Sequence, residues 1–246
     1  MKVITPNVLN SKLKTAIISA ENSEITEFLE KEGINLIPVF NKDILPKYER
    51  SHADMRALHL GSKDIICYKE EEEIINELKS RGFNPILTES KQEGDYPKSA
   101  GLNALVIGNI IVLNKKCADI RLLEYAQNNG FELIFTRQGY ARCSSCIVSE
   151  KAVITADKSV YNALKDKLDV LLISEGNILL CDTKDGMIGG ASFMIDKNTI
   201  FFCVYLTKHP DYINISNFLK KHSVKAVFPK NIPLTDIGSA VLLECQ

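Results

Sequence analysis

The sequence has no tryptophan, no excess of basic residues and no long apolar run. Lysine plus arginine (30) nearly balances aspartate plus glutamate (31), so the net charge is only −1. A nucleic-acid-binding surface normally shows a basic excess, and a membrane-spanning helix needs roughly 20 apolar residues. The N-terminal stretch MKVITPNVLNSKLKTAIISAEN also lacks the apolar core of a signal peptide. These absences predict no nucleic-acid partner, no membrane partner and a cytoplasmic location.

The seven cysteines show no disulfide pattern. Their number is odd, and Cys67, Cys181 and Cys203 lie in apolar, strand-like runs, where a free thiol acts as a small hydrophobic group. A secreted disulfide framework has an even number of spaced cysteines. We therefore expect reduced thiols, as in cytosolic proteins.

What the sequence does contain is an ordinary globular composition and an internal repeat. Its 246 residues, 45% hydrophobic and 25% charged, suffice for one large core. Five segments share one pattern, in which apolar residues at helical spacing are followed by a stop and a short apolar strand. They read SEITEFLEKEGINLIPVF, EEIINELKSRGFNPILT, DIRLLEYAQNNGFELIFT, SVYNALKDKLDVLLIS and ISNFLKKHSVKAVFP. Gly33, Gly82 and Gly130 end the first three helices, because glycine takes the left-handed cap conformation without strain; Leu168 and Ser223 replace it in the last two.

A polar or glycine-rich stretch and an apolar hairpin follow each of these strands, and the turns GSKD, GN, SEK and DKN suit a hairpin. The repeat units are approximately 23–68, 70–114, 118–157, 159–205 and 211–244. The last unit lacks a closing strand, and the strand at 15–20 has no partner in its own unit. We expect this strand to complete the last unit and close one ring, which removes two exposed sheet edges.

The predicted fold is therefore a single-domain, five-bladed, pseudo-symmetric α/β propeller spanning residues 1–246. An ordinary α/β sandwich of similar βαβ units is the alternative. The hairpin in every unit favours the propeller, because parallel doubly wound folds return through helices.

Polar residues interrupt each unit at the same place, where its inner strand begins. In a ring these positions meet at the axis, which predicts a shared polar cavity. The residues concerned are His52 and Asp54; Tyr96, Ser99 and Asn103; Cys143, Ser144 and Cys146; Gly189, Gly190 and Ser192; Asp236 and Ser239.

Each of these residues also has a purely structural interpretation. His52 and Asp54 can form a loop hydrogen bond, and a lone C-x-x-C such as Cys143 to Cys146 is a weak metal or redox signal that is also compatible with inert packing. The segment GMIGGAS precedes a strand and not a helix, so it predicts close backbone approach and not a phosphate loop. Arg56 near the axis suits orientation of a carboxylate ligand.

Four segments, SHADMRALHLG, QGYARCSSCIVSEKAVITAD, IGGASFMID and DIGSAVLLE, resemble landmarks of an uncharacterised family. That family is assigned to the fold of the guanidino-group-modifying enzymes, or penteins, which include arginine deiminases, amidinotransferases and dimethylarginine hydrolases. The resemblance implies a cysteine that attacks a guanidinium carbon, with a His-x-Asp pair and further carboxylates that bind and protonate the substrate. His52-Ala53-Asp54 resembles the His-x-Asp element, but it lies in the first unit here and near the fourth in those enzymes. Their nucleophile lies in the last unit, where this sequence has Ser239.

Three functions follow as hypotheses. The first is a hydrolase or transferase acting on a guanidino or amine compound, with Cys143 or Cys146 as a non-standard nucleophile, His52 as acid and base, and Asp54 holding the cation. Its ligand is a small molecule, and no cofactor or metal is expected. The second is a non-catalytic binding module of the same fold, and the third is a metal or redox site that uses His52, Cys143 and Cys146. The substrate-binding residues predicted for the first are Arg56, Asn103, Tyr140, Ser192, Asp236 and Ser239.

Overall fold

The computed structural model describes residues 5–181, 183, 185–203, 205–229 and 235–245. Over these residues the chain forms five α-helices, three short 3-10 helices and five three-stranded sheets. The helices are α1 (Ser23–Lys31), α2 (Glu72–Ser80), α3 (Ile120–Asn128), α4 (Lys158–Leu164) and α5 (Tyr212–Lys221), with η1 (Ala53–Met55), η2 (Lys98–Ala100) and η3 (Leu206–Lys208). The strands are β1 (Leu13–Ser19), β2 (Asn35–Val39), β3 (Ala57–Gly61), β4 (Asp64–Cys67), β5 (Asn84–Leu87), β6 (Leu105–Ile107), β7 (Ile110–Leu113), β8 (Glu132–Phe135), β9 (Ser145–Ser149), β10 (Ala152–Thr155), β11 (Asp169–Leu172), β12 (Ser192–Asp196), β13 (Thr199–Phe202), β14 (Lys225–Val227) and β15 (Ala240–Cys245). The predicted α/β class is confirmed, and the five sheets fit a five-unit repeat.

Four of the five sheets share one connection pattern. In the sheet β3-β4-β5, an antiparallel hairpin joins β3 to β4, and α2 carries the chain from β4 to the parallel strand β5. Two parallel strands need such a crossover connection, because a tight turn can join only antiparallel strands. The sheets β6-β7-β8, β9-β10-β11 and β12-β13-β14 repeat this arrangement with α3, α4 and α5.

The fifth sheet joins the two ends of the described chain. Strand β1 lies in its middle, antiparallel to β15 with Ile17 opposite Val241, and parallel to β2 with Ile17 opposite Ile37. Each of the other four sheets takes its hairpin from one sequence repeat and its helix and outer strand from the next. The repeats read from the sequence begin at the helix, whereas the sheets begin at the hairpin.

The helices begin and end where local chemistry favours it. The side chains of Asn22, Asp119 and Asp157 accept hydrogen bonds from the first-turn amides of α1, α3 and α4, which satisfies amides that have no partner within the helix. After α5, Ser223 takes a φ of +58°, close to the +72° of Gly130 after α3. Ser223 therefore takes the left-handed conformation that glycine takes after the first three helices. No helix among the described residues is both long enough and apolar enough to cross a membrane.

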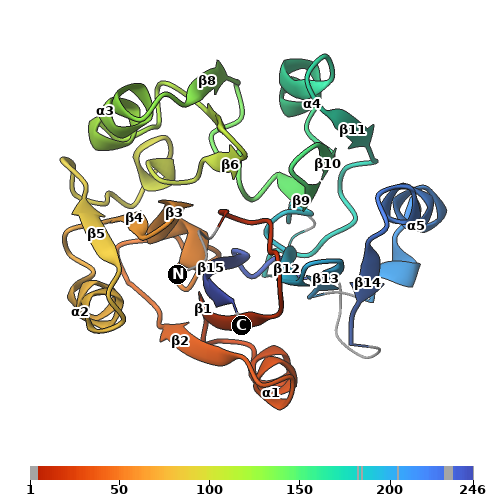
Figure 1. Cartoon of the computed structure of the whole chain (residues 1–246), viewed down its shortest axis with the longest axis horizontal. Helices are drawn as coiled ribbons and strands as arrows, with labels where there is room; N and C mark the ends of the chain where they lie inside the picture. The colour runs from red at the N-terminus through yellow and green to blue at the C-terminus, as the bar shows by residue number, and fades with distance from the viewer. Residues whose placement is uncertain (1–4, 182, 184, 204, 230–234, 246) are drawn as a thin grey trace.

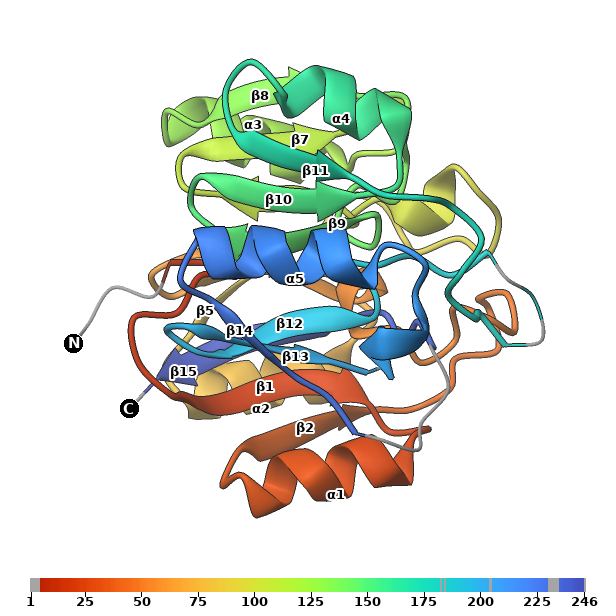
Figure 2. The same ribbon diagram turned by 90° about the vertical axis from the view of Figure 1, so that its right-hand side faces the viewer.

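Figure 1 shows the five sheets around a common centre, with the helices on the outside and the strands β3, β6, β9, β12 and β15 nearest the centre. Apolar side chains fill the space between neighbouring sheets and beneath the helices. The longer connecting loops gather on one side of the molecule, at the right in Figure 2. These loops lead into the inner strands and supply the polar residues described next.

Candidate active site

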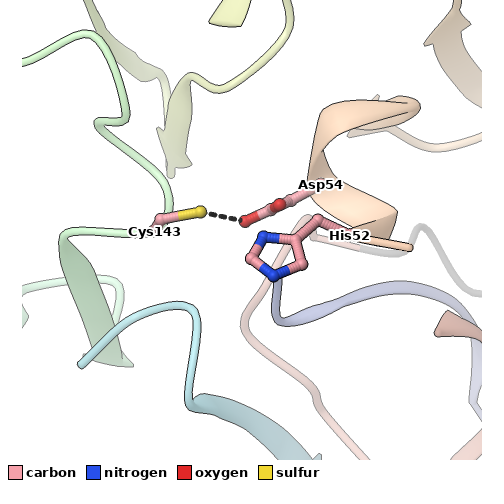
Figure 3. Close-up of side chains that lie close together, drawn as sticks. All are labelled: His52, Asp54 and Cys143. Atoms are coloured by element: carbon pink, nitrogen blue, oxygen red, sulfur yellow. Dashed lines mark hydrogen bonds between the residues drawn. The ribbon is translucent and has the colours of Figure 1, made fainter. Parts of the chain in front are cut away.

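Three chemically reactive side chains from two segments of the chain lie close together (Figure 3). Cys143 lies just before β9 and its Sγ donates a hydrogen bond to Asp54 Oδ2, which belongs to η1 before β3, at 2.8 Å. One donor atom each from His52, Asp54 and Cys143 lies within 4.8 Å of the others, and all three residues are buried. Thiol, carboxyl and imidazole are thus close enough to exchange protons after small shifts.

The turn at Gly238 fixes His52 and Asp54 from behind. The Asp54 amide donates to the Gly238 carbonyl at 3.2 Å, and Gly238 has a φ of +73°, which favours glycine. A Cβ on Gly238 would lie 2.3 Å from the Cβ and Cγ of His52. Only glycine therefore lets the imidazole occupy this place.

Asn103 positions the thiol. Its Oδ1 accepts from the amides of Arg142 and Cys143 at 3.0 and 3.1 Å, and its Nδ2 donates to Cys143 Sγ at 3.1 Å. One amide side chain, which is buried, therefore orients both the backbone and the sulfur of Cys143. Donation to sulfur also favours the thiolate over the thiol.

Arg142 places a buried positive charge beside the cluster. Its guanidinium donates to the carbonyls of Ser145 and Gly189, each at 3.2 Å, and to Ser239 Oγ. These contacts join the loops that lead into β9, β12 and β15. The nearby charges that act on Arg142 include those of Asp54 and Asp236, so a fixed cation offsets part of the negative charge at the site.

Asp236 is held by backbone amides. Its Oδ1 accepts from the Gly238 amide and its Oδ2 from the Met187 amide, both at 2.9 Å. A Cβ on Gly190 would lie 1.9 Å from Asp236 Oδ1, and the Gly190 amide donates to the Cys143 carbonyl at 2.8 Å. The close backbone approach predicted for GMIGGAS therefore leaves room for the Asp236 carboxylate.

The cluster opens onto a cavity of about 320 Å³. Cys143, His52, Tyr140 and Asp236 line it, together with Glu49, whose Oε1 accepts from the Tyr140 hydroxyl at 2.7 Å. The other oxygen of Glu49 is buried and has no hydrogen-bond partner among the described residues. Burial raises the pKa of Glu49, although the Tyr140 hydrogen bond opposes the rise. Within the described part of the chain, Glu49 therefore has one carboxyl oxygen with a donor and one without.

Burial sets the protonation of the reactive groups. It raises the pKa of Asp54 from its ordinary 3.8 to about 7, against the lowering effect of the Cys143 hydrogen bond. Burial and the charges of Asp54 and Asp236 raise the pKa of the Cys143 thiol well above its ordinary range. Burial lowers the pKa of His52, and the Asp236 charge opposes that change. Without a ligand the site therefore holds a neutral thiol and a neutral imidazole near pH 7.

The family model described as "Family of unknown function (DUF6873)" matches residues 17–241, which is most of the chain. The chain belongs to this family. The resemblance to an uncharacterised family predicted from the sequence is thereby confirmed. No curated protein is significantly similar to the chain in sequence.

Solved structures share the fold of this DUF6873 protein. The inosamine-phosphate amidinotransferase from Streptomyces griseus superposes with a TM-score of 0.62 at 10% identity, over 100% of this chain and 98% of that one. An amidinotransferase of the saxitoxin biosynthetic pathway from Microseira wollei gives 0.59 at 15% identity, over 94% and 92%. The dimethylarginine dimethylaminohydrolase from Pseudomonas aeruginosa, in complex with citrulline, gives 0.58 at 8% identity, over 91% and 93%. At these identities the similarity shows a shared fold and not a shared reaction.

The structure brings some predicted residues of the DUF6873 chain together and separates others. Six lie in or directly against the cluster and cavity: His52, Asp54, Asn103, Tyr140, Cys143 and Asp236. Cys146 lies in β9 and is fully buried in the apolar core. Of the two thiols, the structure therefore places only Cys143 beside His52 and Asp54.

Three predicted ligand-binding residues have structural partners in this DUF6873 protein. Arg56 binds Glu71 at 2.8 Å and the backbone carbonyls of Phe40 and Arg50, so its guanidinium braces a loop. Ser192 Oγ donates to the Ile188 carbonyl at 2.7 Å, and Ser239 Oγ donates to the Ser192 carbonyl at 3.0 Å. All three side chains are buried, and none lines the cavity.

Among the site residues that were not predicted from the sequence, Glu49 and Arg142 carry charge. Glu49 lies in an irregular loop with other charged residues, where no periodicity distinguishes it. The sequence did offer a signal for Arg142. It lies just before an apolar strand-like run, and an arginine buried at such a place needs partners.

Proposed function

We propose that this protein is a hydrolase or transferase that acts on a guanidino or amine compound through a covalent bond to Cys143. The observation that carries this proposal is the contact of Cys143 Sγ with Asp54, beside His52, at the wall of a cavity with further carboxylates. The solved amidinotransferases and hydrolases with the same fold support it at the level of architecture. We interpret the five sheets as blades of one closed propeller with this cavity on its axis.

The roles follow from the chemistry of each group. A guanidinium is a planar fork of N–H donors, which carboxylates bind well, so Asp54, Asp236 and Glu49 hold the cation. The Cys143 thiol gives its proton to the neutral His52, and the thiolate attacks the guanidinium carbon. As the C–N bond breaks, His52 returns that proton to the leaving amine. An amidino group then remains on sulfur until water or an acceptor amine attacks its carbon and the thiol is regenerated.

Ligand charge explains how an inert thiol becomes reactive. Burial and the charges of two carboxylates keep Cys143 protonated in the empty site. A cation within a few ångströms of sulfur favours the thiolate by on the order of 4 kcal/mol, at the effective dielectric of partly buried sites. The same cation draws the proton from Asp54. The substrate therefore activates its own nucleophile, and the empty site is protected from oxidation.

This assignment moves the nucleophile relative to the enzymes that the sequence resembles. Their nucleophile corresponds to the position of Ser239, whose hydroxyl is buried and bonded to Arg142 and to the Ser192 carbonyl. The hydroxyl has no neighbouring base in those contacts. Cys143, which precedes a strand of a different sheet, has Asp54, His52 and the cavity beside it.

Mass spectrometry of the intact protein after incubation with a panel of guanidino compounds tests this function. We expect a mass increase of one amidino group, mapped to Cys143, with release of an amine. Cys143→Ser should abolish the adduct, whereas Cys146→Ser, which changes an equally buried thiol in the same segment, should retain it. Tight binding of a guanidinium without adduct or product would favour a non-catalytic binding module and would refute the enzymatic proposal.

A metal site is the second candidate, favoured by one specific observation. The imidazole, carboxylate and thiol donors of His52, Asp54 and Cys143 lie within 4.8 Å of one another, and zinc binds all three donor types. This set replaces Cys146 of the sequence-based hypothesis with Asp54. Elemental analysis of protein purified without an affinity tag distinguishes the candidates, because stoichiometric zinc lost in Cys143→Ser would support a metal centre.

A further inference from the structure

We infer that the ligand of this cavity is a guanidine or amidine whose carbon chain carries no carboxylate. This inference rests on the proposed function and narrows its substrate class. It follows from the charges around the cavity, from two carboxyl oxygens without donors, and from the apolar part of the cavity wall.

Over the part of the chain that the structure describes, the charged side chains that line the cavity are acidic. Glu49, Asp185 and Asp236 line it, and among the residues that the structure describes no lysine or arginine does. The two nearby buried arginines are both engaged elsewhere. Arg142 binds two carbonyls and a serine, and Arg56 binds Glu71 and loop carbonyls. A carboxylate on the ligand would therefore meet negative charges with no cationic partner.

In the described ranges of the chain, two buried carboxyl oxygens lack donors, one on a residue of the cavity wall and one in the adjoining cluster of His52, Asp54 and Cys143. Oε2 of Glu49 and Oδ1 of Asp54 are buried and have no hydrogen-bond partner among the described residues. An unsatisfied buried acceptor is unfavourable until a donor reaches it. Glu49 is only 4% exposed and lines the cavity, so an N–H of a bound cation is the group that fits.

The rest of the wall suits a carbon chain. Met55, Met187 and Leu180 line the cavity beside the carboxylates, and thioether side chains adapt to flexible alkyl groups. Asp185 is exposed and lines the same cavity, so it attracts a terminal ammonium and repels a terminal carboxylate. An aminoalkylguanidine matches all these groups, whereas an α-amino acid does not.

Calorimetric titration of the Cys143→Ser protein, which prevents turnover, tests the inference with three probes. L-arginine and L-argininamide differ only in carboxylate against neutral amide, and agmatine lacks the group altogether. We expect agmatine and L-argininamide to bind at least ~10-fold more tightly than L-arginine. Glu49→Gln should weaken the binding of both cations, and Asp43→Asn, at an exposed carboxylate, should not.

The outcomes separate the two proposals. L-arginine binding as tightly as L-argininamide would overturn the inference while leaving the guanidino function intact. Lys184 lies outside the described residues, so Lys184→Ala is titrated in parallel to identify a cationic partner in that case. Failure of all three probes to bind would instead contradict the proposed function itself.

Discussion

Replacing Asp54 with asparagine should make the protein more stable at neutral pH while abolishing its chemistry. Asp54 is 4% exposed, one of its oxygens lacks a partner, and burial raises its pKa from 3.8 to about 7. A carboxyl whose pKa is raised on folding contributes stability that is fully present below 3.8 and is lost as the pH rises through 7. Asparagine does not titrate, so the variant escapes this loss.

The magnitude follows from the shift. One pKa unit corresponds to about 1.4 kcal/mol, so a rise from 3.8 to about 7 amounts to on the order of 4 kcal/mol. About 2 kcal/mol of this falls between pH 5 and pH 7. A domain is typically stable by about 5–15 kcal/mol, so the effect is a large fraction of the total.

Urea unfolding followed by circular dichroism, at pH values from 5 to 8.5, measures this effect. The quantity of interest is the unfolding free energy of Asp54→Asn minus that of the wild type. This difference cancels the titration of groups common to both proteins, and a change in hydrogen bonding adds only a constant. Asp43→Asn, at an exposed side chain, controls for removal of a negative charge. A difference that stays flat from pH 5 to pH 7 would refute the burial-driven rise in the pKa of Asp54.

Three further perturbations test other parts of the account. Gly238→Ala should displace His52, abolish adduct formation and lower the free energy of unfolding by about 2 kcal/mol or more. Gly130→Ala, at a residue with a φ of +72° and open space around it, should lower it by only about 1 kcal/mol in the same urea unfolding assay. Equal losses would contradict the steric explanation. Arg142→Met should lower the free energy of unfolding by about 3 kcal/mol or more, because it removes the hydrogen bonds of a buried charged donor. Arg142→Lys should recover part of this loss in the same assay. If Arg142→Met left the stability unchanged, the guanidinium would not be what joins the three loops. Burial lowers the pKa of His59, so the folded state resists protonation of this imidazole, and the stability of the protein should fall by up to ~1.4 kcal/mol per pH unit below pH 6.5. His59→Asn should reduce this dependence of stability on pH. An unchanged dependence would be inconsistent with a buried neutral imidazole.

The repeat could be read from the sequence because each unit carries its own local signals. Helical spacing of apolar residues, a positive-φ residue after the helix and a hairpin turn all lie within a short window, as at Gly33 and Gly82. The sheet boundaries depend instead on pairing over long distances. Strand β1 pairs with β15 at the other end of the chain. This long-range pairing, and not local preference, determines that each of the other four sheets begins at a hairpin and ends with the strand after the next helix.

The candidate site was partly predictable for the same reason. His52, Asp54 and Cys143 precede the inner strands of their units at equivalent places, and the structure brings one donor atom of each within 4.8 Å of the others. The choice between Cys143 and Cys146 depends on a turn, in which the Ser145 amide donates to the Arg142 carbonyl before β9 begins. Periodicity does not specify such a turn.

Two charged residues whose surroundings could not be predicted from the sequence, Arg56 and Glu49, lie in loops. Arg56 has the right charge for a carboxylate ligand, but Glu71 and loop carbonyls surround it. Glu49 lies among other charged residues, and only the folded loop buries it against Tyr140. In both cases the partner is set by the path of an irregular segment.

The central claim is that a bound cation converts Cys143 from an inert thiol into a thiolate. Stopped-flow ultraviolet absorbance at pH 7.5, on mixing the protein with agmatine, detects the thiolate directly, and Cys143→Ser supplies the baseline. The account predicts no Cys143 thiolate signal in the empty protein, because burial and two carboxylates raise the pKa of the thiol, and a signal that appears on binding before the adduct forms. Saturating agmatine binding with no Cys143-dependent signal and no adduct would contradict it.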